Sequence, residues 1–299
     1  KNDESQFLAI VGDDGIGKSA LLAHWVKSHY CQNSDYSIVF HSIGNGDGDN
    51  SINVVCQHIF AEIADIYGID YNLPRTFDTV SVIEGLYAKI AGNNKKTLVI
   101  LDGVNYLSSD NNDKQLRWIG FPPKNIRFIF SSVPSDETVD VFESNDFQIL
   151  KFESFNDSIR AEIINGYLKL FGKKISMSQI DIIIAHPLMK NTRLLCSLLS
   201  EIISFSRWQE LEDRISYYLT SKSKREFYDK VLERFEQDFG YELTSNVLSL
   251  IVLVKNGIAE KAILEVLNIS QLKFSQFHYA FLSNFFVISE RFHLANASL

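Results

Sequence analysis

The sequence predicts an α/β protein: a parallel sheet flanked by helices, followed by a helical bundle and a winged-helix segment. Three observations support this prediction. A glycine-rich loop joins an apolar strand at residues 7–11 to a helical pattern that begins near Ala20. An apolar run with β-branched members at residues 98–101 ends in Asp102, a pattern typical of a buried parallel strand. Beyond residue 156, apolar residues recur at helical spacing until a hairpin pattern at 285–294.

The loop after the first strand carries a phosphate-binding motif, G-x-x-x-x-G-K-[ST], in its required strand-to-helix setting. Glycine lets the backbone turn its N–H groups inward, and the following helix directs its positive end at the same point. We expect Lys18 to reach the β- and γ-phosphates of a nucleotide and the Ser19 hydroxyl to bind Mg²⁺. The candidate nucleotide-binding residues of this loop are Gly12, Asp13, Asp14, Gly15, Ile16, Gly17, Lys18, Ser19 and Ala20.

Two further strands end in polar residues at the sheet edge where ligands bind in such folds. Asp102 follows one of them and is the candidate magnesium-side acid; the alternative is a helix N-cap at the strand exit. Ser131 or Ser132 ends the strand at 125–132 and is placed to sense the γ-phosphate or the attacking water. We select Ser131, with Lys18 and Asp102, as the candidate catalytic set.

The remaining elements follow from periodicity. Strand patterns occupy 36–42 and 147–152, and helical spacing covers 19–29, 52–67, 76–91, 156–172, 177–185, 188–205, 223–239, 245–255, 260–267 and 271–282. Two prolines close a further helix within 115–123. We therefore expect a nucleotide-binding domain at 1–155, a helical domain at 156–240 and a winged-helix domain at 241–299. The chain starts just before a strand and stops in an unfinished helical pattern, so we expect the last domain to be truncated and the chain to be a piece of a longer protein.

The composition limits the cellular compartments and the binding partners that we expect. The 299 residues allow two or three domains, and 45% hydrophobic with 22% charged residues is typical of a globular protein with a sizeable core. The net charge of −8 argues against sequence-independent binding of nucleic acid, which needs a basic face. The 3 cysteines form no paired framework, and no apolar run has transmembrane length. We therefore expect a cytoplasmic protein without a membrane span.

The order of these motifs resembles the STAND class of signalling P-loop NTPases. The residues that carry the resemblance are the phosphate loop with Leu98-Val-Ile-Leu-Asp102-Gly103 and Phe128-Ile-Phe-Ser-Ser132, followed by the bundle and the winged helix. Two phrases, Phe40-His-Ser-Ile-Gly44 and Leu116-Arg-Trp-Ile-Gly-Phe-Pro-Pro123, strengthen it. The chain is most similar to NACHT-type members found beside WD or TPR repeats in animals and to bacterial antiviral relatives.

This resemblance implies a nucleotide-gated switch. In the family, ADP locks a closed monomer, and ligand sensing by flanking repeats permits exchange for ATP, opening and oligomerisation, which brings effector domains together. The resemblance thus implies ATP or ADP with Mg²⁺ as cofactors, self-association through the NTPase region, and a role in innate immune or antiviral defence. It also places Pro187 against the nucleotide and a winged-helix histidine on the β-phosphate. His293 fits that position in one register, whereas Asn296 fits it in another, and an exposed hairpin histidine is the alternative for His293.

Three positions depart from the family pattern. Where the family often has a further acid that orients water, this chain has Asn105 and Tyr106, and where it often has an arginine after the strand-end serines, this chain has Val133. An amide and a phenol do not act as a carboxylate base. These differences weaken hydrolysis more than binding, so we expect a slow ATPase or a switch.

Two alternative functions stay open. One is an interaction scaffold in which the nucleotide is a permanent filler, with little or no hydrolysis. The other is a DNA-handling ATPase of the initiator kind, which also pairs a P-loop sheet with a winged helix. Its expected basic wing is poorly matched by Ser289-Glu-Arg-Phe-His293, which offers one arginine beside an acid.

Overall fold

The chain folds into two compact units, Lys1–Glu153 and Ser154–Leu299, each with a hydrophobic core of its own. The structure, a computed structural model, describes residues 5–31, 36–44, 50–70, 77–108, 110–205, 207–254, 257–280, 285–288 and 291–294. The division into three domains stays a prediction.

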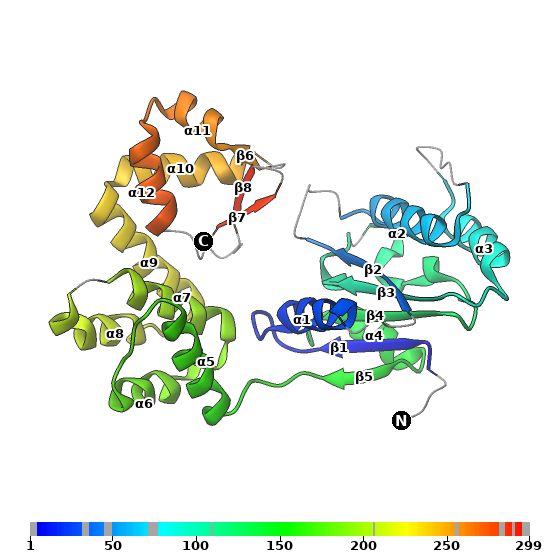
Figure 1. Cartoon of the computed structure of the whole chain (residues 1–299), viewed down its shortest axis with the longest axis horizontal. Coiled ribbons are helices and arrows are strands. Elements are labelled where there is room, and N and C mark those ends of the chain that lie inside the picture. Colours follow the sequence, from blue (N-terminus) through cyan, green and yellow to red (C-terminus); the bar gives the residue numbers. More distant parts are fainter. Residues whose placement is uncertain are drawn as a thin grey trace. The chain divides into compact units, whose positions relative to one another are not determined.

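The first unit is built on a five-stranded parallel sheet with the strand order β2-β3-β4-β1-β5 (Figure 1). Its strands are β1 (Phe7–Val11), β2 (Tyr36–Ser42), β3 (Lys96–Asp102), β4 (Ile126–Ser132) and β5 (Gln148–Lys151). Its α-helices are α1 (Lys18–Cys31), α2 (Ile52–Tyr67), α3 (Thr79–Ile90) and α4 (Thr138–Ser144). The predicted α/β class, a parallel sheet flanked by helices, is confirmed.

Alternation along the strands separates two cores, one on each face of the sheet. Val99 and Leu101 of β3 join the larger core, which α2, α3 and α4 cover. Leu98 and Ile100 face the other side and pack with Leu22 of α1. The helix that follows the phosphate loop therefore lies on the face that Leu98 and Ile100 share.

The predicted helix within 115–123 is wrong. The 3₁₀ turn η3 (Arg117–Ile119) lies in this region instead, after the turns η1 (Val104–Tyr106) and η2 (Asp110–Gln115). Leu116 has a left-handed backbone, with φ of 56°, which prevents an α-helix from running through it. The helix expected over 76–91 starts at Thr79, because the Asp78 side chain accepts a hydrogen bond from the Ser81 N–H and caps it.

The second unit begins with a helical bundle, as predicted. Its helices are α5 (Asp157–Leu170), α6 (Met177–Ala185), η4 (Pro187–Lys190), α7 (Thr192–Ser204), η5 (Trp208–Glu210), α8 (Leu211–Leu219) and α9 (Lys224–Phe239). The helix expected over 188–205 is divided, because the Asn191 side chain caps α7 by accepting from the Leu194 N–H. The helices α4 and α8 were not predicted from the sequence.

The last part of the second unit contains three helices and a small antiparallel sheet of order β6-β8-β7. These elements are α10 (Tyr241–Leu253), β6 (Ile258–Ala259), α11 (Glu260–Leu267), α12 (Gln271–Ala280), β7 (Phe285–Ile288) and β8 (Arg291–Leu294). The expected helices and hairpin are present, whereas their assignment to the winged-helix class stays a prediction.

A buried ion pair joins three helices of the bundle. Arg234 of α9 donates to both carboxylate oxygens of Glu201 of α7, at 2.9 and 2.7 Å, and Tyr218 of α8 donates to the same carboxylate at 2.5 Å. Burial alone would lower the pKa of Arg234, but the hydrogen bonds to Glu201 outweigh burial and raise it. The buried Arg234 guanidinium therefore depends on Glu201 as its partner.

Among the described residues, no helix is both long enough and apolar enough to cross a membrane.

Replacing Glu201 by alanine leaves the Arg234 guanidinium buried without its bidentate partner. We expect the free energy of unfolding, measured by urea titration, to fall by about 3–5 kcal/mol. Asp238→Ala is the matched control, because Asp238 pairs with the same Arg234 at 3.1 Å but is 51% exposed. That change should cost about 1 kcal/mol or less, and equal losses for the two variants would contradict this account.

Candidate functional site

The loop between β1 and α1 has a conformation that its glycines make possible. Gly15 and Gly17 have φ of 76° and 115°, values that strain any residue with a Cβ. At Gly12 the constraint is close contact, because a Cβ there would lie 2.5 Å from the carbonyl oxygen of Phe152. The Phe152 N–H donates to the Val11 carbonyl at 2.7 Å, which holds the segment after β5 against the loop.

Lys18 lies inside this loop. Its ammonium donates to the carbonyl oxygens of Gly12 at 2.6 Å and Asp13 at 3.0 Å, and the residue is only 9% exposed. The next residue, Ser19, is exposed in the first turn of α1, which begins with a hydrogen bond from the Leu21 N–H to the Gly17 carbonyl at 2.9 Å. A fixed cation, the helix N-terminus and an exposed hydroxyl thus converge at one place, an arrangement suited to phosphate.

Asp102 and Ser131 meet at the same edge of the sheet. Asp102 continues the alternation of Leu98 and Ile100, so its side chain belongs to the face that α1 covers. The Ser131 hydroxyl donates to Asp102 Oδ1 at 2.5 Å and accepts from the Gly103 N–H at 2.8 Å. Within the described part of the chain, no side chain bonds to the other oxygen, Oδ2. Ser131 therefore orients Asp102 and leaves one carboxylate oxygen for a cation.

The neighbouring Ser132 has a different role, because successive strand residues point to opposite faces. Its hydroxyl shares a 2.6 Å hydrogen bond with Thr138, whose hydroxyl donates to Asp136 at 2.8 Å. Lys114 pairs with Asp136 at 2.7 Å. Burial favours a higher pKa for Asp136, but hydrogen bonds from Lys114 and Thr138 outweigh burial and lower it. This network fixes the turn after β4, so Ser131 is the serine that contacts the site.

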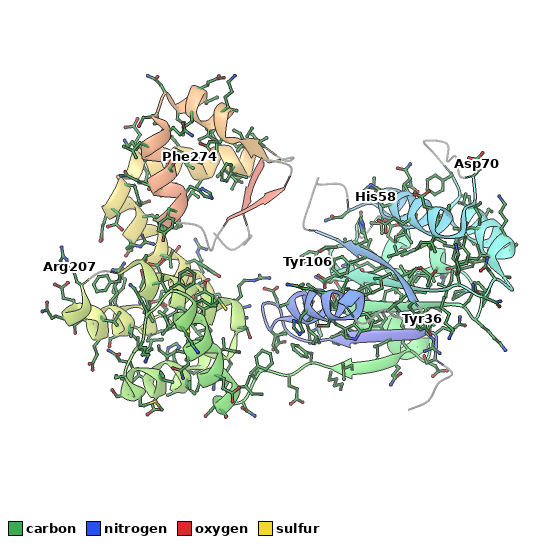
Figure 2. All side chains as sticks on the ribbon, viewed as in Figure 1. Tyr36, His58, Asp70, Tyr106, Arg207 and Phe274 are labelled. Carbon is green, nitrogen blue, oxygen red and sulfur yellow. The ribbon has the colours of Figure 1, made fainter. Side chains whose placement is uncertain are left out.

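Tyr106, which is labelled in Figure 2, lies over two glycines that follow β2 and β3. A Cβ at Gly44 would come within 2.8 Å of its ring, and a Cβ at Gly103 within 2.9 Å. The ring is 48% exposed. The Asn50 side chain accepts a hydrogen bond from the Gly44 N–H at 3.2 Å. An aromatic ring therefore packs against Gly103, the residue that follows Asp102, at a position where an acid is absent from the sequence.

The other predicted site residues are distributed as follows. Asp13 is exposed, Asp14 is half-buried and Ile16 is buried in the loop, while Ala20 is exposed on α1. Pro187 and His293 belong to the second unit.

Pro187 is exposed at the start of η4, and His293 pairs with Phe286 in the β7–β8 register, but its side chain is outside the description. Asn296 lies outside the described residues. The proposed nucleotide contacts of Pro187 and His293 stay predictions.

Sequence reasoning missed Phe152 and the connection between Ser131 and Asp102. Phe152 ends a recognisable strand pattern, but nothing in that pattern shows that the strand pairs with β1 and closes over Gly12. A glycine closely follows each of the strands β2 and β3, and both glycines have φ near 85°. Glycine at these two positions is the sequence signal that could have indicated the close contact with the Tyr106 ring.

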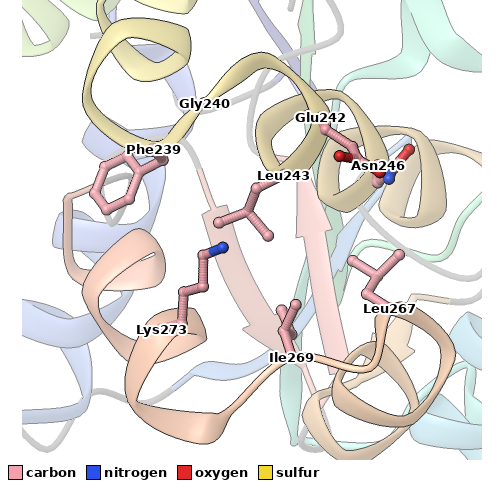
Figure 3. Close-up of a pocket in the computed structure, with 8 residues that line it drawn as sticks. All are labelled: Phe239, Gly240, Glu242, Leu243, Asn246, Leu267, Ile269 and Lys273. Atoms are coloured by element: carbon pink, nitrogen blue, oxygen red, sulfur yellow. The ribbon is translucent and has the colours of Figure 1, made fainter.

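The second unit has a pocket of about 330 Å³ between the ends of α9 and α11 and the starts of α10 and α12 (Figure 3). Its polar side chains include Glu242 and Lys273, which have opposite charges and are both exposed. Because a phosphate site needs donors held away from water, we place the candidate nucleotide site at the loop of the first unit.

No protein-family model matches the chain. It is similar to a TPR repeat-containing protein from Dictyostelium discoideum. The identity is 26% over an alignment 293 residues long, which covers 83% of this chain. The chain spans 18% of the length of that relative.

Solved structures with a similar chain fold include Cdc6p from Pyrobaculum aerophilum. Its sequence identity is 12% over 95% of this chain and 82% of that chain, with a TM-score of 0.47. AMPPCP-bound DnaA from Aquifex aeolicus has 15% identity over 93% of this chain and 79% of that chain, with a TM-score of 0.41. Scores this low carry no functional inference. The strand, loop and helix around Lys18, set in a parallel sheet, give the chain the α/β P-loop ATPase fold.

Ser131→Ala should weaken Mg²⁺-dependent nucleotide binding by about tenfold, because Asp102 loses the donor that orients it. Isothermal titration with ADP, in Mg²⁺ and then in EDTA, measures this effect. Ser132→Ala is the matched control, since it removes a buried serine hydroxyl from the opposite face. Equal effects of the two variants on the Mg²⁺-dependent component would contradict the assignment of Ser131.

Proposed function

We propose that this chain is the nucleotide-binding part of a STAND-class, NACHT-like signalling switch. It binds ATP or ADP with Mg²⁺, hydrolyses ATP slowly, and controls the oligomerisation and activation of effector domains elsewhere in a longer protein, in innate immune or antiviral defence. The observation that carries the nucleotide site is the buried Lys18 ammonium inside a glycine loop, on the sheet face that also presents Asp102.

The residues present fit a magnesium nucleotide. Lys18 and the loop N–H groups would hold the phosphates, while the Ser19 hydroxyl and Asp102 Oδ2 would hold the cation. Within the described residues, no three His, Cys, Asp or Glu side chains gather to bind a metal. Two protein ligands suit Mg²⁺, which usually takes its other ligands from phosphates and water. Bound Mg²⁺ would neutralise charge on the phosphates.

Slow hydrolysis is supported by the side chains next to Asp102. Asn105 presents an amide, and Tyr106 covers the two glycines with its ring, so neither supplies a carboxylate to orient water. Val133, half-buried after β4, supplies no positive charge. Phosphoryl transfer depends on positioning and charge stabilisation, and the loop with Lys18 still provides part of both.

The signalling part of the proposal rests on the motif order and on the relative. The similar Dictyostelium protein is a TPR repeat-containing protein of which this chain spans 18%. This supports a parent protein in which repeats sense a trigger and a separate domain responds. In the same proposal, Pro187 and His293 contact the nucleotide from the second unit.

The lack of an acid at Asn105 also favours the alternative of a scaffold that retains its nucleotide permanently. A DNA-handling role remains a separate alternative, and fluorescence polarisation with duplex DNA at physiological salt tests it. Micromolar or tighter binding with a steep salt dependence would favour that role over the switch.

Lys18→Ala tests the proposal most directly, because it removes the cation that the loop surrounds. We expect calorimetry to show loss of Mg·ATP and ADP binding and sedimentation to show loss of nucleotide-dependent assembly, with the chain still folded. Lys27→Ala, at an exposed lysine of the same helix, is the control. A large loss of thermal stability in Lys18→Ala would favour the scaffold, and absence of nucleotide binding by the unmodified protein would refute both.

Steady-state ATP turnover should be about 1 per second or slower, at the low end for phosphoryl transfer. Tyr106→Glu should raise it, because it places a carboxylate against Gly103, the residue after Asp102, where it can orient water. Tyr106→Phe keeps the ring over the glycines and should leave turnover unchanged. Turnover of tens per second in the unmodified protein would contradict the proposal of a slow switch.

A further inference from the structure

A groove of about 610 Å³ lies in the first unit at the amino ends of the strands, at the edge opposite to the phosphate loop. Phe7, at the start of β1, and Phe147, just before β5, stack at 4.7 Å with nearly parallel rings and line it. Ile119 and Val141 add further apolar surface. The groove is therefore an apolar recess remote in the sheet from the nucleotide site.

One rim of the groove presents an unusually exposed aromatic residue. Phe121 is 91% exposed, although it belongs to the groove lining and follows Gly120. Upstream of it, Leu116 has φ of 56°, a left-handed conformation that is costly for a residue with a Cβ, and Gly120 has φ of 59°, which glycine adopts readily. The Gln6 side chain donates to the carbonyl of Pro122 at 3.2 Å and so fixes this rim to β1. The protruding ring is thus part of an ordered rim.

The two rims carry opposite charges. Arg117 is exposed on the rim that holds Phe121, and Asp146 is exposed on the opposite rim, between the lining residues Asn145 and Phe147. Among the described residues, neither Arg117 nor Asp146 forms an ion pair. Asp146 has φ of 55°, a left-handed conformation that Asp tolerates better than most residues.

We propose that this groove binds the same groove of a second copy of the chain. A two-fold interface pairs each patch with itself, so a patch must carry both halves of every contact. Here Phe121 of each copy enters the recess of the other, and Arg117 of each copy faces Asp146 of the other. The contact uses the amino edge of the sheet, so it does not rest on nucleotide binding at the carboxyl edge.

The expected interface is small. Two buried phenylalanine rings contribute roughly 300–500 Å², so the rims supply the larger share even of an interface below about 1,200 Å². We therefore expect a weak dimer, with a dissociation constant of roughly 10–100 μM.

Sedimentation equilibrium on the whole 299-residue chain tests the proposal. Phe121→Asp should weaken dimerisation at least tenfold without loss of thermal stability, because the replaced ring is exposed. The matched control is Leu170→Asp, which changes an 81% exposed apolar residue of the second unit and should leave the dimer intact. Lys18→Ala should also leave this dimer intact, which separates the present inference from the proposed nucleotide switch.

Charge variants test the pairing between copies. Arg117→Glu should weaken the dimer, because it places two acids together, and adding Asp146→Asn should restore part of the loss by removing that repulsion. A chain that stays monomeric at about 500 μM, well above the expected dissociation constant, would overturn the proposal and assign the groove to another occupant. Equal effects of Phe121→Asp and Leu170→Asp, or no recovery with Asp146→Asn, would overturn it as well.

Discussion

The site depends on one geometric constraint: parallel strands bring their carboxyl ends to the same edge of the sheet. β1 delivers the glycine loop there, β3 delivers Asp102 and β4 delivers Ser131, although these residues are far apart in the sequence. The period of two along a strand then selects the face. Asp102 and Ser131 point toward the side covered by α1, whose first residue is Lys18, so the cation and the carboxylate face a common space.

Close backbone contact maintains this arrangement. Gly12 admits the Phe152 carbonyl, and the glycines at the ends of β2 and β3 admit the Tyr106 ring. The polar groups of the site also restrain one another, since Ser131 connects the Asp102 carboxylate to the Gly103 N–H. Because Ser131 and Gly103 are buried, their hydrogen bonds satisfy polar groups that would otherwise lack partners, and they orient Asp102 before any ligand is considered.

The two edges of the sheet differ in chemistry. The carboxyl edge gathers a buried ammonium and an oriented carboxylate, whereas the amino edge presents stacked aromatic rings and the exposed Phe121. In the second unit, a buried ion pair between Glu201 and Arg234 joins α7 to α9. Such a pair specifies how the helices meet, since neither charge is tolerated in the core without the other.

The sequence by itself determined the phosphate loop, the five strands of the sheet and most of the helices, because each of these depends on neighbours within a few residues. Glycine spacing, alternation with a period of two, and apolar residues at helical spacing are all local signals. They failed at residues 115–123, where the left-handed Leu116 breaks a helical pattern, and at α4 and α8, which are short helices with weak periodicity. The tertiary structure alone decided the strand order, the contact of Ser131 with Asp102 and the position of Phe152 over Gly12. These contacts join residues 29 and 140 positions apart, and no local pattern in a sequence encodes which distant strand becomes a neighbour.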